Sequence, residues 1–455
     1  MPESPPKDLR YAENLRREGK LQEALKVIND IEKKGTLTPK DELSLLILKG
    51  KIYTLFQQYI ESMKIGEITY KLSQSLERIL DRIMALLFKA NCVFLRQSEE
   101  TLSFLLEAEK LLSSLHDVSP TFISRQKANI LFRKSWAYNY KGDLDNAFEA
   151  ATECLKIYES FNRKSEIAYT FQVIGFIFEA KNQFDVARDN ALKSLKLFEE
   201  IRDPIGTATT IVLLGRISYY TGDLNKALQY FKKSLSTRVV VDNDKLSNYF
   251  FTGLTYETKG ELDRALRYYK RSSSLAKKLN QYEIFIDSQI FIGSIYVKKR
   301  EFELALEYLK PSLTLSKNTN NGLGIALSLL FIGSIYETQD LPLELQKISD
   351  QLKELSEKYK NPIIVQGYQL LDAVILKRSG RSCDRAEAEK LLKSIVEDPR
   401  VPGFFTYSLV YLCEFYLEEL YLYNESEIFE ELSPLIGRLF KFSEEQNSYS
   451  ILAEN

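Results

Sequence analysis

The sequence predicts an all-α protein, a right-handed superhelical solenoid of stacked antiparallel helix hairpins. In residues 207–236, apolar and small side chains mostly recur at intervals of three, four and seven, the spacing of helices that each bury one face. A break centred on Gly222 separates the two helices. The same pattern returns about every 40 residues along the chain. Because one hairpin cannot bury both of its faces, a chain built of such units stacks them.

A small residue near the middle of each first helix defines the register of the repeat, and we call this residue the mark. Neighbouring marks are 38 to 45 residues apart, and most are 40 apart. In six units an alanine follows twelve residues after the mark, as Ala227 follows Gly215. Small residues at both places let the two helix backbones approach closely. The marks predict eleven hairpins and an incomplete twelfth: Ala12, Gly50, Ala90, Ser135, Gly175, Gly215, Gly253, Gly293, Gly333, Ala373, Cys413 and Ala453.

This order of small residue, aromatic residue, glycine and alanine resembles the tetratricopeptide repeat. The clearest copies are GRISYYTGDLNKALQYFKKSL from Gly215, GLTYETKGELDRALRYYKRSS from Gly253 and GSIYVKKREFELALEYLKPSL from Gly293. The resemblance covers nearly the whole chain. Since that family usually repeats every 34 residues or so, a period near 40 is similar to its long-helix variety.

The domain prediction is a single solenoid over residues 1–455 with three parts. Residues 1–125 hold degenerate repeats, residues 126–398 match the pattern best, and residues 399–455 form a divergent repeat with an incomplete last helix. Two prolines predict helix boundaries. A helix should end within residues 116–120, before Pro120, and Pro342 can open a second helix, a position that proline tolerates well.

The last mark, Ala453, lies two residues before the end of the sequence, which leaves three interpretations open. Phe440–Ala453 serves as a polar cap, the sequence is truncated, or the end docks onto a partner or a second copy. The third interpretation predicts possible self-association through the C-terminal end.

Composition argues against several classes of partner. Lys and Arg number 62 against 63 Asp and Glu, a balance that disfavours nucleic acid as the main ligand. Residues 1–10 lack an apolar stretch, and no run of about 18 apolar residues occurs, so we expect a cytoplasmic protein without a membrane partner. Residues 259–300 hold ten Lys or Arg and four Asp or Glu, whereas residues 403–455 hold two and ten. These regions either steer partners or are solvated outer faces.

No constellation of residues predicts an enzyme. A single histidine, His116, excludes the usual zinc hydrolase sites, and no glycine-rich phosphate cradle follows a strand. The four cysteines lie far apart in sequence, which favours small buried or idle thiols. The sequence therefore predicts no catalytic residue, no cofactor and no metal.

The resemblance implies that first helices line a concave groove through residues six and three before the mark and one and four after it. We expect a non-catalytic scaffold or adaptor that holds a peptide or helix there; the alternative is a peptide- or ligand-sensing arm of a signalling or transcription-control system. The clamp of Lys and Asn residues that binds carboxylates in chaperone-binding relatives is missing. Whether the groove aromatics bind or only pack stays open. The candidates are Asn129, Phe132, Trp136, Asn139, Tyr169, Gln172, Phe176, Arg216, Tyr219, Phe250 and Glu257.

Overall fold

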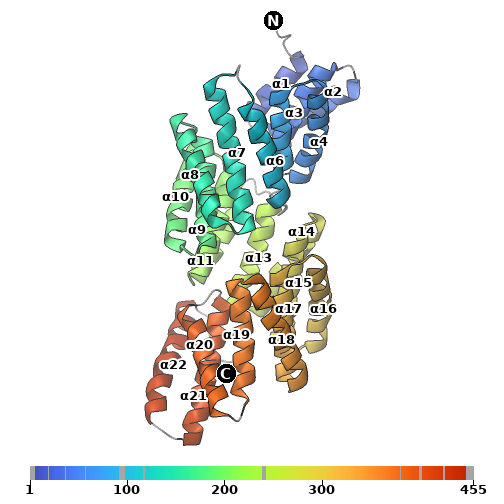
Figure 1. Cartoon of the computed structure of the whole chain (residues 1–455). Helices are drawn as coiled ribbons and strands as arrows, with labels where there is room; N and C mark the ends of the chain where they lie inside the picture. Colours follow the sequence, from blue (N-terminus) through green and yellow to red (C-terminus); the bar gives the residue numbers. More distant parts are fainter. Residues whose placement is uncertain are drawn as a thin grey trace. The chain divides into compact units, whose positions relative to one another are not determined.

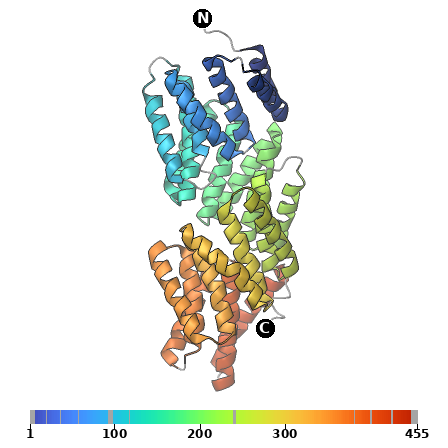
Figure 2. The same ribbon diagram turned by 90° about the vertical axis from the view of Figure 1, so that its right-hand side faces the viewer.

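A computed structural model describes residues 6–18, 20–35, 37–56, 58–91, 98–115, 118–237, 242–379, 381–398, 402–423 and 426–446. These residues form twenty-two α-helices and no strand, so the prediction of an all-α fold is confirmed. The helices form the eleven successive pairs that the marks predict. The chain divides into two compact units, Met1–Leu213 and Leu214–Asn455. Figure 1 labels most of the helices, and Figure 2 shows the same ribbon turned by 90°, with successive helices packed side by side within each unit.

The first unit is built from five helix pairs and the start of α11. Its helices are α1 (Lys7–Arg17), α2 (Leu21–Lys34), α3 (Pro39–Leu55), α4 (Tyr59–Ser75), α5 (Ile79–Lys89), α6 (Ser98–Ser113), α7 (Pro120–Lys141), α8 (Leu144–Ser160), α9 (Lys164–Ala180), α10 (Phe184–Ile201) and α11 (Pro204–Tyr220), which continues into the second unit.

The second unit continues the same alternation. Its remaining helices are α12 (Leu224–Leu235), α13 (Asp242–Thr258), α14 (Leu262–Lys278), α15 (Tyr282–Lys298), α16 (Phe302–Asn318), α17 (Gly322–Thr338), α18 (Pro342–Tyr359), α19 (Pro362–Lys377), α20 (Ser382–Glu397), α21 (Pro402–Tyr423) and α22 (Ser426–Gln446).

Helix starts follow familiar signals. Helix α18 begins at Pro342, as the sequence predicts, and α7 begins at Pro120; proline suits this place because it lacks only an N–H that the first turn leaves unpaired. The Ser119 hydroxyl accepts from the backbone N–H of Phe122 at 3.3 Å and caps α7. In α17 the side chain of Asn321 accepts from the N–H of Gly324 at 2.9 Å. These caps satisfy donors that the helix itself cannot pair.

The turns inside the hairpins require a residue in the left-handed region. Gly222 and Gly260 take that place, with φ of +80° and +74°. Other hairpins use Asn182, Arg300 and Asp340 at φ between +53° and +59°. Glycine in the sequence therefore predicts only some of the left-handed turns between the helices.

The mark residues sit where two helices of a pair meet. An added Cβ at Gly215 would lie 2.5 Å from the ring of Phe231, and one at Gly253 would lie 2.6 Å from the ring of Tyr269. Ala227 and Ala265 on the facing helices are fully buried. Close approach of the backbones, filled by one aromatic ring, is thus the common core of these hairpins.

Several predictions concern residues outside those that the structure describes. They are the thiol of Cys92, the helix end at His116 and the mark at Ala453. The other three cysteines are free thiols; Cys154 and Cys413 are buried, and Cys383 is exposed. Of Phe440–Ala453, the described part up to Gln446 belongs to α22.

Candidate functional site

First helices form the inner face of each unit. Within the described helices, first helices of successive pairs contact one another, for example α7 with α9 and α15 with α17. No two second helices contact each other to a similar extent among those helices. The inner face is therefore the surface on which side chains from several repeats can meet one ligand.

The inner face of the first unit carries an aromatic patch, made of Trp136, Asn139, Tyr140 and Phe176. The Trp136 ring stacks on Tyr140 at 5.7 Å between centroids and meets Phe176 of α9 at 5.3 Å. Trp136 is 8% exposed, whereas Tyr140 is 41% exposed. Phe132, one turn before Trp136, is half-buried and packs against the same cluster. Two hairpins thus bring large rings together at a surface that solvent reaches.

Asn139 adds a polar group to the aromatic patch. Its Oδ1 atom is buried and has no hydrogen-bond partner among the described residues. A buried amide oxygen without a donor costs free energy, which a bound N–H group would recover. The patch therefore combines apolar area with one acceptor that the chain leaves unsatisfied.

The other predicted residues of the first unit hold its hairpins together. Asn129 accepts a hydrogen bond from Tyr158 Oη at 2.9 Å, and Tyr169 Oη donates to Asp203 Oδ2 at 3.0 Å. Gln172 is buried and its Nε2 donates to Thr210 Oγ1 at 2.8 Å. These contacts give the three side chains packing roles.

Three predicted residues of the second unit are engaged in ring contacts. The guanidinium of Arg216 lies 4.8 Å from the ring centroid of Phe251. Tyr219 is buried against the same ring, at 6.0 Å, and burial raises the pKa of its hydroxyl. Phe250 meets Phe291 of the next first helix edge to face at 5.5 Å. The inner face here is filled by its own aromatic side chains.

Glu257, the last predicted residue, is the centre of a buried polar cluster. Its carboxylate accepts from Tyr269 Oη at 2.6 Å and from Ser294 Oγ at 3.0 Å, and it pairs with Lys298 Nζ at 2.9 Å. Burial alone lowers the pKa of Lys298, but the neighbouring carboxylate outweighs burial and raises that pKa. The cluster joins α13, α14 and α15.

Side chains of α21 reach across the inner face of the second unit. Tyr411 Oη donates to Glu337 Oε2 of α17 at 3.1 Å, although the two residues are 74 apart in sequence. Lys298 Nζ of α15 lies 5.6 Å from the ring centroid of Tyr407. Lys377 of α19 pairs with Glu414 at 3.1 Å. These contacts, the α21 contacts, link the first helices of several repeats.

Sequence reasoning missed Tyr140, Lys298, Tyr407 and Tyr411. Tyr140 stands one helical turn after Trp136, so an i, i+4 aromatic pair was a signal for it. Lys298, Tyr407 and Tyr411 gave no local signal, because their partners come from other repeats.

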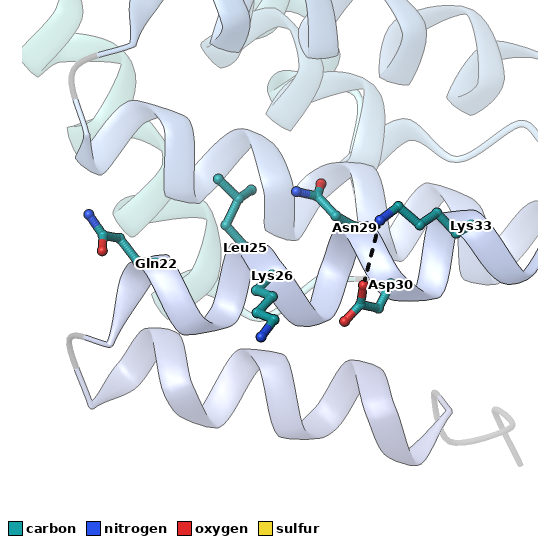
Figure 3. A pocket seen from close by; sticks show the side chains of 6 residues that line it. All are labelled: Gln22, Leu25, Lys26, Asn29, Asp30 and Lys33. Atoms are coloured by element: carbon teal, nitrogen blue, oxygen red, sulfur yellow. Dashed lines mark ion pairs between the residues drawn. The ribbon is translucent and has the colours of Figure 1, made fainter.

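Two hollows outside the inner face are lined mainly by polar side chains. One, of about 330 Å³, lies against α2 alone and is lined by six residues on one side of that helix, where Asp30 pairs loosely with Lys33 at 3.9 Å (Figure 3). The other, of about 580 Å³, is lined by acidic residues of α20 and α22 with Tyr416 and Pro434. Within the described residues, no cluster of His, Cys, Asp or Glu could hold a metal ion, and no helix is long and apolar enough to cross a membrane.

Comparisons with known proteins identify two segments by sequence. Residues 207–278 and residues 128–161 each match a family model described as a tetratricopeptide repeat. No curated protein matches the chain. The matched segments include the part of α7 that carries Trp136 and most of the hairpins marked by Gly215 and Gly253.

Solved structures resemble the chain at low sequence identity. The Rap conjugation gene regulator of plasmid pLS20 in complex with the Phr* peptide is 16% identical over 77% of this chain and 96% of its own, with a TM-score of 0.49. Aspartyl phosphate phosphatase F from Bacillus subtilis is 14% identical, and the match covers 80% of this chain and 97% of that protein, with a TM-score of 0.48. Yeast Tom70 is 15% identical, and the match covers 98% of this chain and 96% of Tom70, with a TM-score of 0.42.

Proposed function

Because this chain carries tetratricopeptide repeats, we propose that it is a non-catalytic scaffold or adaptor that holds a peptide or helix of another protein on its inner face. The observation that supports this most is the aromatic patch with its unpaired amide oxygen on Asn139. Exposed aromatic rings anchor peptides because they offer a large contact area at little entropic cost. Once the Asn139 amide turns toward the bound segment, a backbone N–H of the peptide would donate to its Oδ1.

The proposal includes a cytoplasmic location and a protein partner rather than nucleic acid or a membrane. Its support is the nearly neutral charge of −1 and the lack of an apolar run in the sequence. It also treats residues 1–455 as one repeat array, which the regular alternation of helices in both units supports.

The test of the peptide site uses Trp136, the only tryptophan of the chain, as its reporter. Peptides are selected against the full chain from a random library and then titrated while the Trp136 emission is followed. We expect the selected peptides to carry aromatic or large aliphatic side chains. Tyr140→Ala and Asn139→Leu should each weaken their binding about tenfold, as loss of a central contact does.

The matched control is Tyr282→Ala, because Tyr282 is 60% exposed on α15 and far from α7 in sequence. This variant should bind the same peptides with unchanged affinity. If Tyr140→Ala and Asn139→Leu also bound them as tightly as the unmodified protein, the peptide site would lie elsewhere.

A sensing arm is the second candidate, and the α21 contacts favour it. A ligand that moved the first helices of the second unit would break the hydrogen bond between Tyr411 and Glu337. Amide hydrogen exchange with and without a selected peptide tests this candidate. Faster exchange in α17 and α21 on binding supports it, and unchanged exchange there argues against it.

Self-association through the C-terminal end is part of the proposal as well. The described part of α22 exposes Phe429 and Phe440, at 60% and 50%. Apolar side chains at the end of a repeat array favour contact with a further surface. Light scattering at rising concentration tests the idea, since a monomer at every concentration would argue against it.

A further inference from the structure

The outer face of the second unit carries exposed cations on two successive second helices. Helix α12 contains no acidic residue, and α14 contains only Asp263, which pairs with Lys299 of α15 at 2.6 Å. Six exposed cations of α12 and α14 make up what we call the basic face: Lys226, Lys232, Lys233, Arg264, Lys270 and Arg271. Helix α14 is labelled in Figure 1.

These six residues are three pairs at equivalent positions of the repeat. Lys226 and Arg264 each follow their mark, Gly215 or Gly253, by eleven residues. Lys232 and Lys270 follow by seventeen, and Lys233 and Arg271 by eighteen. The two marks also pack alike, each against an aromatic ring of its second helix. Because equivalent positions of successive hairpins point the same way in a repeat array, we expect the cations of α12 and α14 to lie on the same face.

Most of the basic face lacks a counter-charge. Arg264 pairs with Glu261, and Arg271 lies over the ring of Tyr268 at 5.5 Å. The four lysines have no ion pair or ring contact within the described part of the chain. Some cations on other second helices have partners, such as Arg188 with Asp185 at 2.9 Å, whereas others, such as Lys156 of α8, are exposed singly. Because like charges on neighbouring turns repel, folding stability alone does not favour this arrangement.

The chemistry of the basic face favours carboxylates over nucleic acid. Cations seven residues apart on α12, such as Lys226 and Lys233, are separated by about 10 Å along the helix axis. Duplex DNA carries a charge about every 1.7 Å, and proteins that bind it are usually strongly basic. This chain has a net charge of −1. A sparse set of cations on a nearly neutral chain suits glutamates that are spaced along a helix.

We propose that the basic face of α12 and α14 docks an acidic segment of a partner protein. This surface lies on second helices of the second unit, whereas the aromatic patch lies on first helices of the first unit. It is therefore a second interaction site, and the array can hold two segments at once. Opposite charges across it would speed association and fix its orientation.

The experiment removes four charges from the basic face of the full chain. The variant combines Lys226→Gln, Lys232→Gln, Lys233→Gln and Lys270→Gln. The probe is a fluorescein-labelled helical peptide whose glutamates face one side, titrated at low and at physiological salt. We expect the variant to bind this probe at least about tenfold more weakly, with a shallower salt dependence.

A matched variant loses the same charge elsewhere. It combines Lys110→Gln, Lys156→Gln, Lys196→Gln and Lys317→Gln, all exposed lysines outside α12 and α14. It should bind the acidic probe as the unmodified protein does. If both variants bound the acidic probe equally weakly, overall charge would explain the effect and the proposal would be overturned.

A single-stranded DNA of the same net charge serves as the competing ligand. The proposal is wrong if that DNA binds the basic face more tightly than the acidic peptide, or if the acidic peptide does not bind the unmodified protein. Peptides selected for the aromatic patch should bind the basic-face variant normally. Failure of one site is thereby distinguished from failure of the other.

Discussion

At the residue scale, the pair of Glu257 and Lys298 predicts a measurable stability effect. Glu257→Gln keeps an acceptor for Tyr269 but removes the negative charge 2.9 Å from Lys298 Nζ. A largely buried cation without its counter-charge costs free energy. Since the Lys298 side chain is 22% exposed, we expect a loss of about 2 kcal/mol in the free energy of unfolding, measured by urea denaturation.

The control for this pair is the double variant Glu257→Gln with Lys298→Met, which removes both charges. It should be more stable than Glu257→Gln alone, because no buried charge is left unpaired. If the stability change of the double variant equalled the sum of the changes for Glu257→Gln and Lys298→Met alone, the two side chains would not interact.

Glu337 predicts a dependence of stability on pH. Burial raises the pKa of Glu337 above its ordinary value of 4.5, and the nearby Glu414 carboxylate raises it further. Tyr411, Arg378 and Lys377 lower this pKa, but burial outweighs them. The folded chain therefore keeps this proton to a higher pH than the unfolded chain does. As pH rises through that interval, the free energy of unfolding falls.

Glu337→Gln removes this loss. In thermal unfolding at a series of pH values above 4.5, the melting temperature of the variant should rise relative to that of the unmodified protein as pH increases. The difference should level off once Glu337 is ionised in the folded protein. Parallel curves for the two proteins would contradict the expectation.

The sequence could predict part of the candidate site. The register places Trp136 and Phe176 at equivalent positions of neighbouring repeats, and the structure brings their rings together at 5.3 Å. It could not predict that Glu257 pairs with Lys298 or that Tyr411 reaches Glu337. Those contacts depend on how successive hairpins turn within the second unit, which no single repeat encodes.

At the scale of the helix pair, two glycines predict opposite effects of the same change. Gly253→Ala puts a methyl group 2.6 Å from the ring of Tyr269, which is fully buried. The ring or the helices must shift, at a cost of about 1 to 3 kcal/mol in the free energy of unfolding. Denaturation monitored by circular dichroism measures the cost.

Gly437→Ala is the matched control, because a Cβ at Gly437 in α22 meets nothing within 4 Å. Alanine favours the helix more than glycine does, so this variant should gain about 0.5 to 1 kcal/mol. Equal effects of the two substitutions would mean that close helix approach is not the reason for Gly253.

Helix boundaries show how far the fold could be predicted. Gly222 and Gly260 mark their turns in the sequence, and Pro120 and Pro342 mark helix starts. The turn at Arg300 carries no such signal, because arginine rarely takes positive φ. In that hairpin the repeat register, rather than turn chemistry, predicts the break.

At the scale of the whole molecule, the single tryptophan reports on one unit only. Trp136 lies in Met1–Leu213, whereas circular dichroism follows helices of both units. Stability in repeat arrays is largely a sum of local terms. Gly253→Ala should therefore shift the circular dichroism transition and leave the Trp136 fluorescence transition in place.

The reciprocal variant is Gly175→Ala in α9 of the first unit, where a Cβ would lie 2.9 Å from Leu213 Cδ2. It should shift the fluorescence transition. Coincident shifts of both signals in both variants would show instead that the chain unfolds as one cooperative block.

The left-handed turns offer a route to thermostable versions of this protein. Four such turns use asparagine, at Asn162, Asn182, Asn280 and Asn320, while Arg300 takes φ of +59° at the same kind of place. Asparagine tolerates this conformation better than arginine. Arg300→Asn should raise the free energy of unfolding by about 0.5 to 1 kcal/mol, which calorimetry can measure. The chain thus contains, in its own better repeats, the replacements that an engineer would choose for its weaker ones.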